Sequence, residues 1–220
     1  MIKSELESPL VSIIINCYNG DRFLEKAIDS IYLQNYSNWE IIFWDNCSTD
    51  NSADIALSYD ERVKYHRAVQ TTPLGEARNL AQKESTGKYI AFLDCDDLYL
   101  PEKLEKQVRL MEASSYAMCY GSVITINEQG QVLKKVPVKN QSGNLFGSLL
   151  KHYEINMQSV MLRRSILTEE QLSFATELKY CPDHNLFMEI ASRFPVGVLQ
   201  DFIIKLSNNS SVGIMAAFSL

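Results

Sequence analysis

The sequence lacks several features that would by themselves assign a protein to a functional class. No apolar run approaches the ~20 residues that a membrane-spanning helix needs, and the segment Met1–Pro9 is too polar for a secretory core. The five cysteines form no CxxC pair, which argues against a zinc site or a disulfide framework. No basic run is present and the net charge is −6, so we expect no nucleic-acid partner. These absences favour a cytoplasmic protein.

Glycine is also missing from the places where a phosphate-binding loop would need it. The chain has nine glycines, and they form neither GxGxxG nor GxxxxGK[ST]. If a nucleotide binds this protein, its phosphates are therefore not neutralised by the amides of a glycine-rich loop. A metal ion would have to do so instead.

The most informative segment that is present is an apolar run that leads into a group of acids. Tyr89 to Leu93 has the composition of a buried parallel strand, and Asp94, Asp96 and Asp97 follow it directly. Ligands of open α/β sheets bind beyond the carboxyl ends of such strands. Carboxylates this close repel one another unless a cation or a ligand joins them, and their hard oxygens suit Mg²⁺ or Mn²⁺. An alternative for Asp97 alone is that it caps the helix that Pro101 begins.

The order of the predicted elements indicates an α/β fold. Strands are expected at 10–15, 40–44, 63–66, 89–93 and 116–123, and helices at 23–32, 52–59, 75–83 and from 101. This alternation predicts a Rossmann-like, mostly parallel sheet with helices on both faces. After Gly121 the pattern changes to a hairpin around 127–130, helices at 148–153 and 183–193, and extended segments at 157–162 and 196–206. We expect a single domain, residues 1–220.

Polar residues stand at corresponding positions after three of the predicted strands. Asn16 to Asn19 follow the first strand, Asp45 and Asn46 follow the second, and Asp94 to Asp97 follow the fourth. Since parallel strands end at the same edge of a sheet, these groups should meet in one crevice.

Four ordered segments carry a resemblance to a known family. The segments look like the motifs of family 2 glycosyltransferases of the GT-A fold, and they comprise residues 9–19, 45–50, 75–79 and 92–97. The resemblance covers roughly the first 110 residues. The resemblance implies a GT-A domain with a nucleotide-binding half at about 9–115 and a smaller, α+β acceptor-binding half at about 116–220. It also implies an inverting, metal-dependent enzyme that uses a nucleotide sugar.

The resemblance further implies roles for the residues of the first half. Asp45 would accept a hydrogen bond from uracil N3–H, and the segment Asn16 to Tyr18 would pack on the base. Asp94 would hold the ribose or share the metal site, and Asp96 would bind the Mn²⁺ or Mg²⁺ that bridges the donor diphosphate.

Two residues of the third motif have an implied role and a structural alternative. Arg78 would lie near the base or phosphates, and Asn79 would position the nucleotide. Their alternatives are a helix-surface arginine and a cap-like amide, because side-chain direction cannot be deduced from the sequence.

In the second half, the general base of this family usually belongs to a Glu-Asp pair that opens a helix. Asp183 matches the second acid of that pair, whereas Pro182 replaces the first. The alternative is that Asp183 only caps its helix. His184 is a weaker candidate for contact with donor or acceptor. Lys205 is a weak phosphate candidate, because Ser207 stands where the family often has histidine.

The expected function is transfer of a sugar from a nucleotide sugar, most simply a UDP-sugar, to a hydroxyl of a saccharide or glycolipid acceptor in surface-polysaccharide synthesis. Two alternatives remain at this point: a sugar-nucleotide-binding module without turnover, and a nucleotidyltransferase. The apolar segment 212–220 is too short to span a bilayer but allows peripheral contact with the inner face of the membrane.

Overall fold

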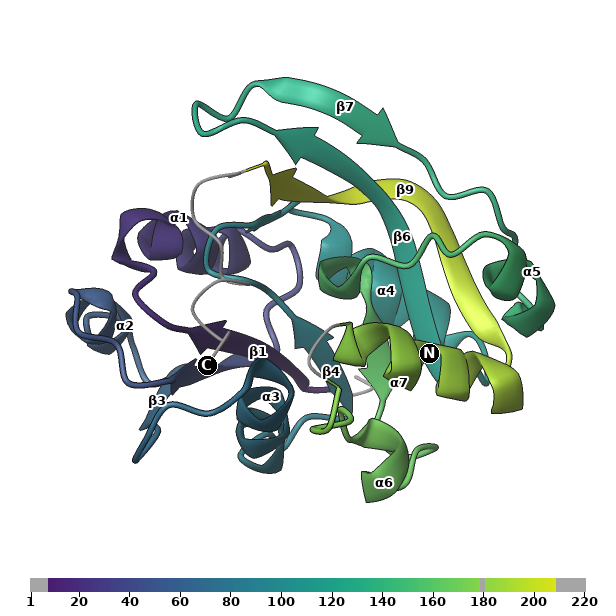
Figure 1. The fold of residues 1–220 in the computed structure, drawn as a ribbon. Coiled ribbons are helices and arrows are strands. Elements are labelled where there is room, and N and C mark those ends of the chain that lie inside the picture. The colour runs from purple at the N-terminus through teal and green to yellow at the C-terminus, as the bar shows by residue number, and fades with distance from the viewer. Residues whose placement is uncertain (1–7, 179–180, 209–220) are drawn as a thin grey trace, which may run out of the picture.

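The structure is a computed structural model that describes residues 8–178 and 181–208. Its strands form one sheet in the order β3-β2-β1-β4-β8-β6-β9-β5, with β7 paired to β6 (Figure 1). The strands are β1 (Val11–Cys17), β2 (Trp39–Asp45), β3 (Val63–Arg67), β4 (Tyr89–Phe92), β5 (Leu98–Tyr99), β6 (Met118–Ile126), β7 (Val132–Val136), β8 (Met161–Arg163) and β9 (Val196–Ser207). The helices are α1 (Asp21–Tyr32), α2 (Ser52–Leu57), α3 (Leu74–Lys83), α4 (Lys103–Glu112), α5 (Phe146–Lys151), α6 (Glu169–Leu172) and α7 (Pro182–Arg193), with a 3₁₀ turn η1 (Met157–Ser159).

The first half of the sheet is parallel, as the sequence predicts. β1 lies between β2 and β4 and runs parallel to both, and β3 continues the parallel set beyond β2. β1, β2 and β4 are buried along their whole length, which explains their continuous apolar sequences. Because the three run in the same direction, their carboxyl ends reach the same edge.

The second half of the sheet is mixed in direction. β8 is antiparallel to both β4 and β6, whereas β9 is parallel to β6. The prediction of an extended segment over 157–162 was wrong in part, since the chain forms η1 before the short strand β8. β5 and α6 were not predicted, because elements of two and four residues are too short to show a periodic pattern.

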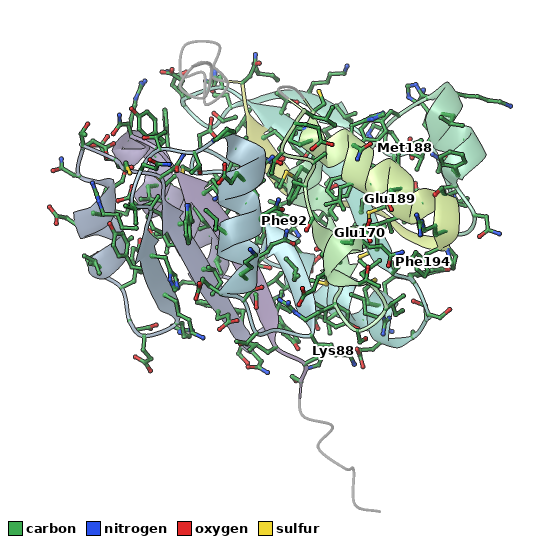
Figure 2. The ribbon with its side chains drawn as sticks, turned by 60° about the horizontal axis from the view of Figure 1, so that its bottom comes forward. Lys88, Phe92, Glu170, Met188, Glu189 and Phe194 are labelled. Atoms are coloured by element: carbon green, nitrogen blue, oxygen red, sulfur yellow. The ribbon has the colours of Figure 1, made fainter. Side chains whose placement is uncertain are left out.

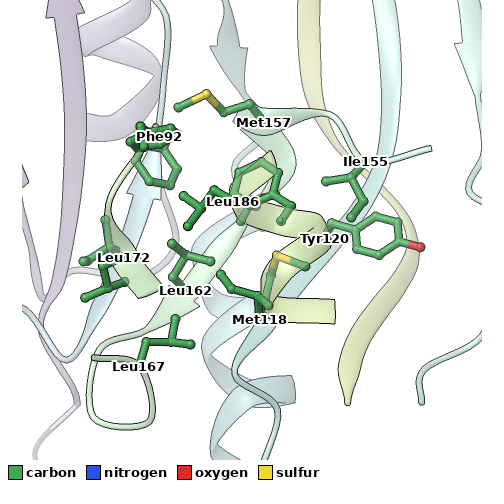
Figure 3. Close-up of a cluster of buried hydrophobic side chains, with 14 of the residues drawn as sticks. Phe92, Met118, Tyr120, Ile155, Met157, Leu162, Leu167, Leu172 and Leu186 are labelled. Carbon is green, nitrogen blue, oxygen red and sulfur yellow. The ribbon is translucent and has the colours of Figure 1, made fainter. Parts of the chain in front are cut away.

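Helices cover both faces of the sheet, as predicted. Side chains of α1, α2 and α4 pack with β1, β2 and β4 in one apolar cluster. Side chains of α3 and α7 belong to a second cluster on the opposite face. Figure 3 shows part of the second cluster, in which Leu186 of α7 lies among Phe92 of β4 and Leu162 of β8. Figure 2 shows α7, marked by Met188 and Glu189, on the same side of the sheet as α3.

The predicted hairpin joins β6 to β7. Gly130 has a φ of +76°, and its N–H donates to the Asn127 carbonyl over 2.8 Å. The Asn127 side-chain oxygen accepts from the backbone amides of Gln129 and Gln131. Asparagine and glycine thus supply the turn chemistry that the pattern indicates.

A buried lysine in α4 makes the stability of the fold depend on pH. Lys103 has no exposed surface, its ammonium lies 4.2 Å from the centroid of the Tyr99 ring, and burial lowers its pKa from 10.5 to about 7. Below pH 7 the lysine is charged in both the folded and unfolded states, so folding must desolvate the charge. From pH 7 towards 10.5 only the unfolded state holds the proton, and stability from this group rises with pH.

Besides the buried charge, Lys103→Met removes the buried hydrogen bond from the ammonium to the Gln107 side-chain oxygen, a loss that is largely the same at pH 6 and at pH 9. We therefore expect the free energy of unfolding of Lys103→Met, relative to wild type, to be higher at pH 6 than at pH 9 by an amount on the order of a few kcal/mol. Thermal unfolding of wild type and variant across this range measures the difference. Lys106→Met in the same helix is the control, since Lys106 is partly exposed and paired with Glu102 and Asp201. A difference between wild type and Lys103→Met that is constant with pH would contradict the burial effect.

Candidate functional site

The segment Asp94–Asp97, here called the acid loop, follows β4 at the carboxyl edge of the parallel strands. Asp97 is buried, and burial together with the charges of Asp94 and Asp96 raises its pKa well above the usual range. The three carboxylates are therefore close enough to repel one another. Asp97 is not a helix cap, contrary to one prediction: α4 begins at Lys103, and the Asp97 side chain accepts from the Ser207 amide over 2.8 Å.

Two side chains contact different oxygens of the Asp94 carboxylate. The Arg78 guanidinium of α3 is 3.5 Å from Oδ1, and the side-chain amide of Gln158 in η1 donates to Oδ2. Arg78 is only 5% exposed and stacks over the Phe174 ring. This burial excludes the alternative of a helix-surface arginine. Arg78 supplies the positive charge that partly balances the acid loop.

Asn79 fastens α3 to the segment that precedes α7. Its side-chain NH₂ donates to the Phe174 carbonyl, and its side-chain oxygen accepts from the Phe174 amide, both over 2.8 Å. This pair of bonds resembles the cap-like alternative more than a direct nucleotide contact. If Asn79 helps to position the nucleotide, as predicted, it does so indirectly, by holding Phe174, on whose ring Arg78 stacks.

Asp45 ends β2 with a fully buried carboxylate. Its Oδ1 accepts from the Ser48 amide over 2.6 Å, whereas Oδ2 accepts from the Tyr65 hydroxyl and from Arg67. The Arg67 side chain is 47% exposed and that of Asp45 is 0% exposed. A base could therefore reach Asp45 only after Arg67 or Tyr65 shifts.

Two buried hydrogen-bond donors lie side by side at the ends of β1 and β2. Asn16 pairs with Trp44 in the parallel register, and both residues are nearly buried. The Asn16 side-chain NH₂ and the Trp44 indole N–H have no hydrogen-bond partner among the described residues. Leaving such donors unpaired typically costs ~1–3 kcal/mol each, so an acceptor from outside the protein would suit this position. Tyr18 lies just beyond and is half-buried.

The loops around this edge contain unusual backbone conformations. Of the non-glycine residues that the structure describes, Asn19, Cys47 and Cys181 have positive φ values. Asn19 follows β1, and its side-chain oxygen accepts from the Thr49 amide in the loop after β2 over 2.8 Å. Backbone conformations of this kind cost free energy and gather at functional sites. Asn19 and Cys47 lie in two of the three loops that the sequence predicts to meet, whereas Cys181 lies at the start of α7.

Asp183 stands in the first turn of α7, beside the start of α3. A Cβ at Gly75 of α3 would lie 3.6 Å from the Pro182 Cβ, so the two helix starts are in close contact. Asp183 is half-buried, and His184 is exposed with its ring centroid 4.4 Å from that of Tyr153. The buried Tyr153 hydroxyl has no hydrogen-bond partner among residues 8–178 and 181–208. Burial and the charge of Asp183 raise the pKa of Tyr153.

The end of β9 completes the neighbourhood of the acid loop. Lys205 pairs in register with Leu98, directly after the acid loop, and the Ser207 amide donates to Asp97. The Lys205 side chain is half-buried. The structure thus brings the weak candidate Lys205 to the same region as Asp94 to Asp97.

The described residues contain no group of three or more His, Cys, Asp or Glu side chains arranged to hold a metal ion. The acid loop still fits Mg²⁺ or Mn²⁺, because such ions usually bind through one or two carboxylates together with substrate phosphates. Burial and the charges of Asp94 and Asp96 raise the pKa of Asp97, so a cation beside the loop would offset the concentrated negative charge. Asp96, which is half-buried, and Asp94 are the residues that would supply the oxygens.

A family model described as "Glycosyl transferase family 2" matches residues 12–168, from the second residue of β1 through β8, which include most of the motif at 9–19 and all of those at 45–50, 75–79 and 92–97. The chain belongs to glycosyltransferase family 2. Among its relatives, the Escherichia coli protein named UDP-Glc:alpha-D-GlcNAc-diphosphoundecaprenol beta-1,3-glucosyltransferase WfgD is 33% identical over 80% of this chain and 68% of its own length. The putative teichuronic acid biosynthesis glycosyltransferase TuaG of Bacillus subtilis is 33% identical over 71% of this chain and 63% of its own length.

Other relatives are much longer. An uncharacterized Rickettsia felis glycosyltransferase is 33% identical over 94% of this chain, yet the chain spans only 34% of that protein. Among solved structures, S. aureus TarS in complex with UDP-GlcNAc has a TM-score of 0.77 at 21% identity, covering 94% of this chain and 60% of TarS. The mannosyltransferase PcManGT from Pyrobaculum calidifontis, in complex with GDP-Man and Mn²⁺, has a TM-score of 0.70 at 17% identity, covering 97% and 60%. These likenesses confirm the GT-A fold of this family 2 member.

Sequence reasoning missed several side chains of the site. Gln158 and Tyr153 lie in the second half, where no motif marks them, and Arg67 lies in an edge strand without a distinctive pattern. Trp44 adjoins Asp45 in the sequence, and that position was a possible signal. An aromatic residue at such a position is more typical of core packing than of a ligand contact, and the structure shows that the Trp44 indole N–H is buried without a partner among the described residues.

Proposed function

We propose that this chain transfers a sugar from a UDP-sugar to a hydroxyl of a saccharide or lipid-linked saccharide acceptor, with inversion at the anomeric carbon. The observation that carries the proposal is the edge shared by β1, β2 and β4. Unpaired donors at Asn16 and Trp44 stand there, and the adjacent β4 leads into the acid loop. A nucleoside diphosphate fits both features, since its base offers acceptor oxygens and its phosphates bind a carboxylate-held cation.

On the nucleotide side, Asp45 accepts a hydrogen bond from uracil N3–H once Arg67 has moved away from its Oδ2. Asn16 donates to a base or ribose oxygen, and Tyr18 packs on the base. Arg78 stays beside Asp94, where its charge also favours an approaching diphosphate. These roles use side chains of β1, β2 and α3, which the sheet and its packing hold in place.

At the diphosphate, Asp96 together with Asp94 would hold Mn²⁺ or Mg²⁺. When bound, such an ion stabilises the negative charge that develops on the departing nucleoside diphosphate. Lys205, at the far end of β9, would add a second positive charge near the phosphates. The acid loop itself is oriented by Arg78, Gln158 and the Ser207 amide.

On the acceptor side, Asp183 takes the proton of the acceptor hydroxyl while that oxygen attacks the anomeric carbon opposite the leaving diphosphate. Its position in the first turn of α7, against the start of α3, places it at the same end of the fold as Arg78. His184 and Tyr153 would line the acceptor beside it. General-base assistance of this kind contributes typically ~10²–10⁴-fold to rate.

The acceptor class is suggested by the relatives. The name of WfgD specifies a diphosphoundecaprenol-linked acceptor, and that of TuaG specifies teichuronic acid biosynthesis. We propose synthesis of a surface polysaccharide at the inner face of the membrane. No helix among residues 8–178 and 181–208 is long and apolar enough to span a bilayer. The apolar segment 212–220, expected to touch the membrane, lies outside the described residues.

The deciding experiment is a screen of nucleotide sugars with Mn²⁺ present, in which hydrolysis of the donor and transfer to saccharide acceptors are both followed. We expect release of UDP from at least one UDP-sugar, and faster release when the acceptor is present. A sugar-nucleotide-binding module would bind UDP and release no sugar. A nucleotidyltransferase would instead form pyrophosphate from a sugar phosphate and a nucleoside triphosphate.

A further inference from the structure

Gln158 reaches the acid loop from the second half of the chain. It lies in η1, between α5 and β8, and is only 6% exposed. Its side-chain NH₂ donates to Asp94 Oδ2, whereas Arg78 contacts Oδ1. Asp94 is therefore held between a cation from α3 and a neutral amide from η1. A residue 64 positions later in the chain thus contacts the first acid of the loop.

The backbone that carries Gln158 is held by contacts other than the one to Asp94. The Asn156 side chain accepts from the Gln158 backbone amide over 3.1 Å, and the Ser159 hydroxyl donates to the Asn156 carbonyl over 2.7 Å. From α4, the Gln107 side chain donates to the Ser159 carbonyl over 2.8 Å. η1 is thus fixed by its own cap and by α4. Gln158 therefore presents its amide to the carboxylate from a backbone that is fixed by other contacts.

The chemistry of an amide suits this place. A second cation beside Arg78 would neutralise the acid loop and reduce its attraction for a metal ion. A further carboxylate would increase the repulsion among the acids of the loop. A neutral NH₂ donor fixes the direction of Asp94 and leaves the net charge of the loop unchanged. The remaining lone pairs of Asp94 then point in a defined direction for a ligand.

We propose that Gln158 is a positioning residue for binding of metal-loaded UDP, acting through the orientation of Asp94. This inference rests on the proposed function, because it concerns the nucleotide site. η1 belongs to the half of the chain that would hold the acceptor, and under this proposal it also takes part directly in the donor site.

Gln158→Met and Gln158→Asn test the inference. Methionine keeps the length without the donor, and asparagine keeps the amide but is one methylene too short. We expect the dissociation constant for UDP with Mn²⁺, measured by calorimetry, to rise about tenfold or more in both variants. The KM for the donor sugar should rise similarly, while the KM for the acceptor and the melting temperature change little. If methionine prevents folding, asparagine still provides the measurement.

Gln82→Met is the matched control. Gln82 is also a buried glutamine, with its side-chain NH₂ 3.0 Å from the Leu172 carbonyl and away from the acid loop. Its affinity for UDP with Mn²⁺ should match wild type. If wild type binds UDP and both Gln158 variants bind it equally well, the inference is overturned alone. The inference is also overturned if Gln158→Asn binds UDP with wild-type affinity, because any polar side chain at this position would then be enough and the reach of glutamine to Asp94 would not matter. A wild-type protein that binds no UDP with Mn²⁺ would overturn the proposed function together with the inference.

Discussion

Replacing Asp183 with asparagine should lower the rate of sugar transfer by ~10²-fold or more, while the affinity for UDP with Mn²⁺ stays near that of wild type. Asparagine keeps the size and hydrogen-bonding shape of the side chain but cannot accept the proton of the acceptor hydroxyl. The measurement is steady-state kinetics with a donor and acceptor found in the screen, alongside calorimetry with UDP. A loss in kcat without a loss in donor binding identifies a group that acts in the chemical step.

The alternative that Asp183 caps its helix is wrong, and the structural role that remains for it, a favourable charge in the first helical turn, predicts a different result. Asp183 follows Pro182 in α7, and the cap position is occupied by Cys181, whose side chain makes no capping hydrogen bond. A carboxylate in a first helical turn contributes ~0.3–1 kcal/mol through the helix dipole. Under that role alone, Asp183→Asn would lower the melting temperature slightly and leave turnover nearly intact. That outcome would remove Asp183 from the mechanism.

A suitable control for Asp183→Asn is Glu189→Gln in the same helix. Glu189 pairs with Arg193 over 3.1 Å at the partly exposed surface of α7, and Figure 2 shows it on the helix away from Phe92. This change also replaces a carboxylate by its amide and alters the net charge equally. We expect activity within about twofold of wild type, because surface ion pairs contribute little. Equal losses of activity in both variants would mean that activity depends on the total charge of α7 and not on a carboxylate at position 183.

The sequence predicts the first half of the fold well because the signals there are local. β1, β2 and β4 are continuous apolar runs, and the polar residues at their ends mark one edge of the sheet. In the second half, β8 has three residues and η1 has three, so tertiary contacts decide their conformation. Periodicity cannot be recognised over segments of this length.

The site contacts that sequence reasoning did not predict are long-range. Asp97 appeared to be a helix cap because Pro101 follows it closely, yet its partner is the Ser207 amide, 110 residues away. Asn79 similarly bonds to Phe174, 95 residues away. The local sequence identifies which residue types gather at the edge, whereas the partner of each one depends on how the second half packs against the first.

Asp96→Ala should abolish the part of UDP affinity that depends on Mn²⁺ and leave the fold intact. The charge of Asp96 is one of those that raise the pKa of Asp97, so its removal relieves repulsion within the acid loop. The melting temperature without metal should therefore stay the same or rise. Calorimetry with UDP, with and without Mn²⁺, measures the affinity, and thermal unfolding measures the stability.

The control for this prediction is Asp54→Ala, at an exposed position of α2. It makes the same change in net charge and should bind UDP with Mn²⁺ as wild type does. Undiminished Mn²⁺-dependent affinity in Asp96→Ala would exclude Asp96 as a metal ligand, and a fall in both variants would indicate a general effect of charge on binding.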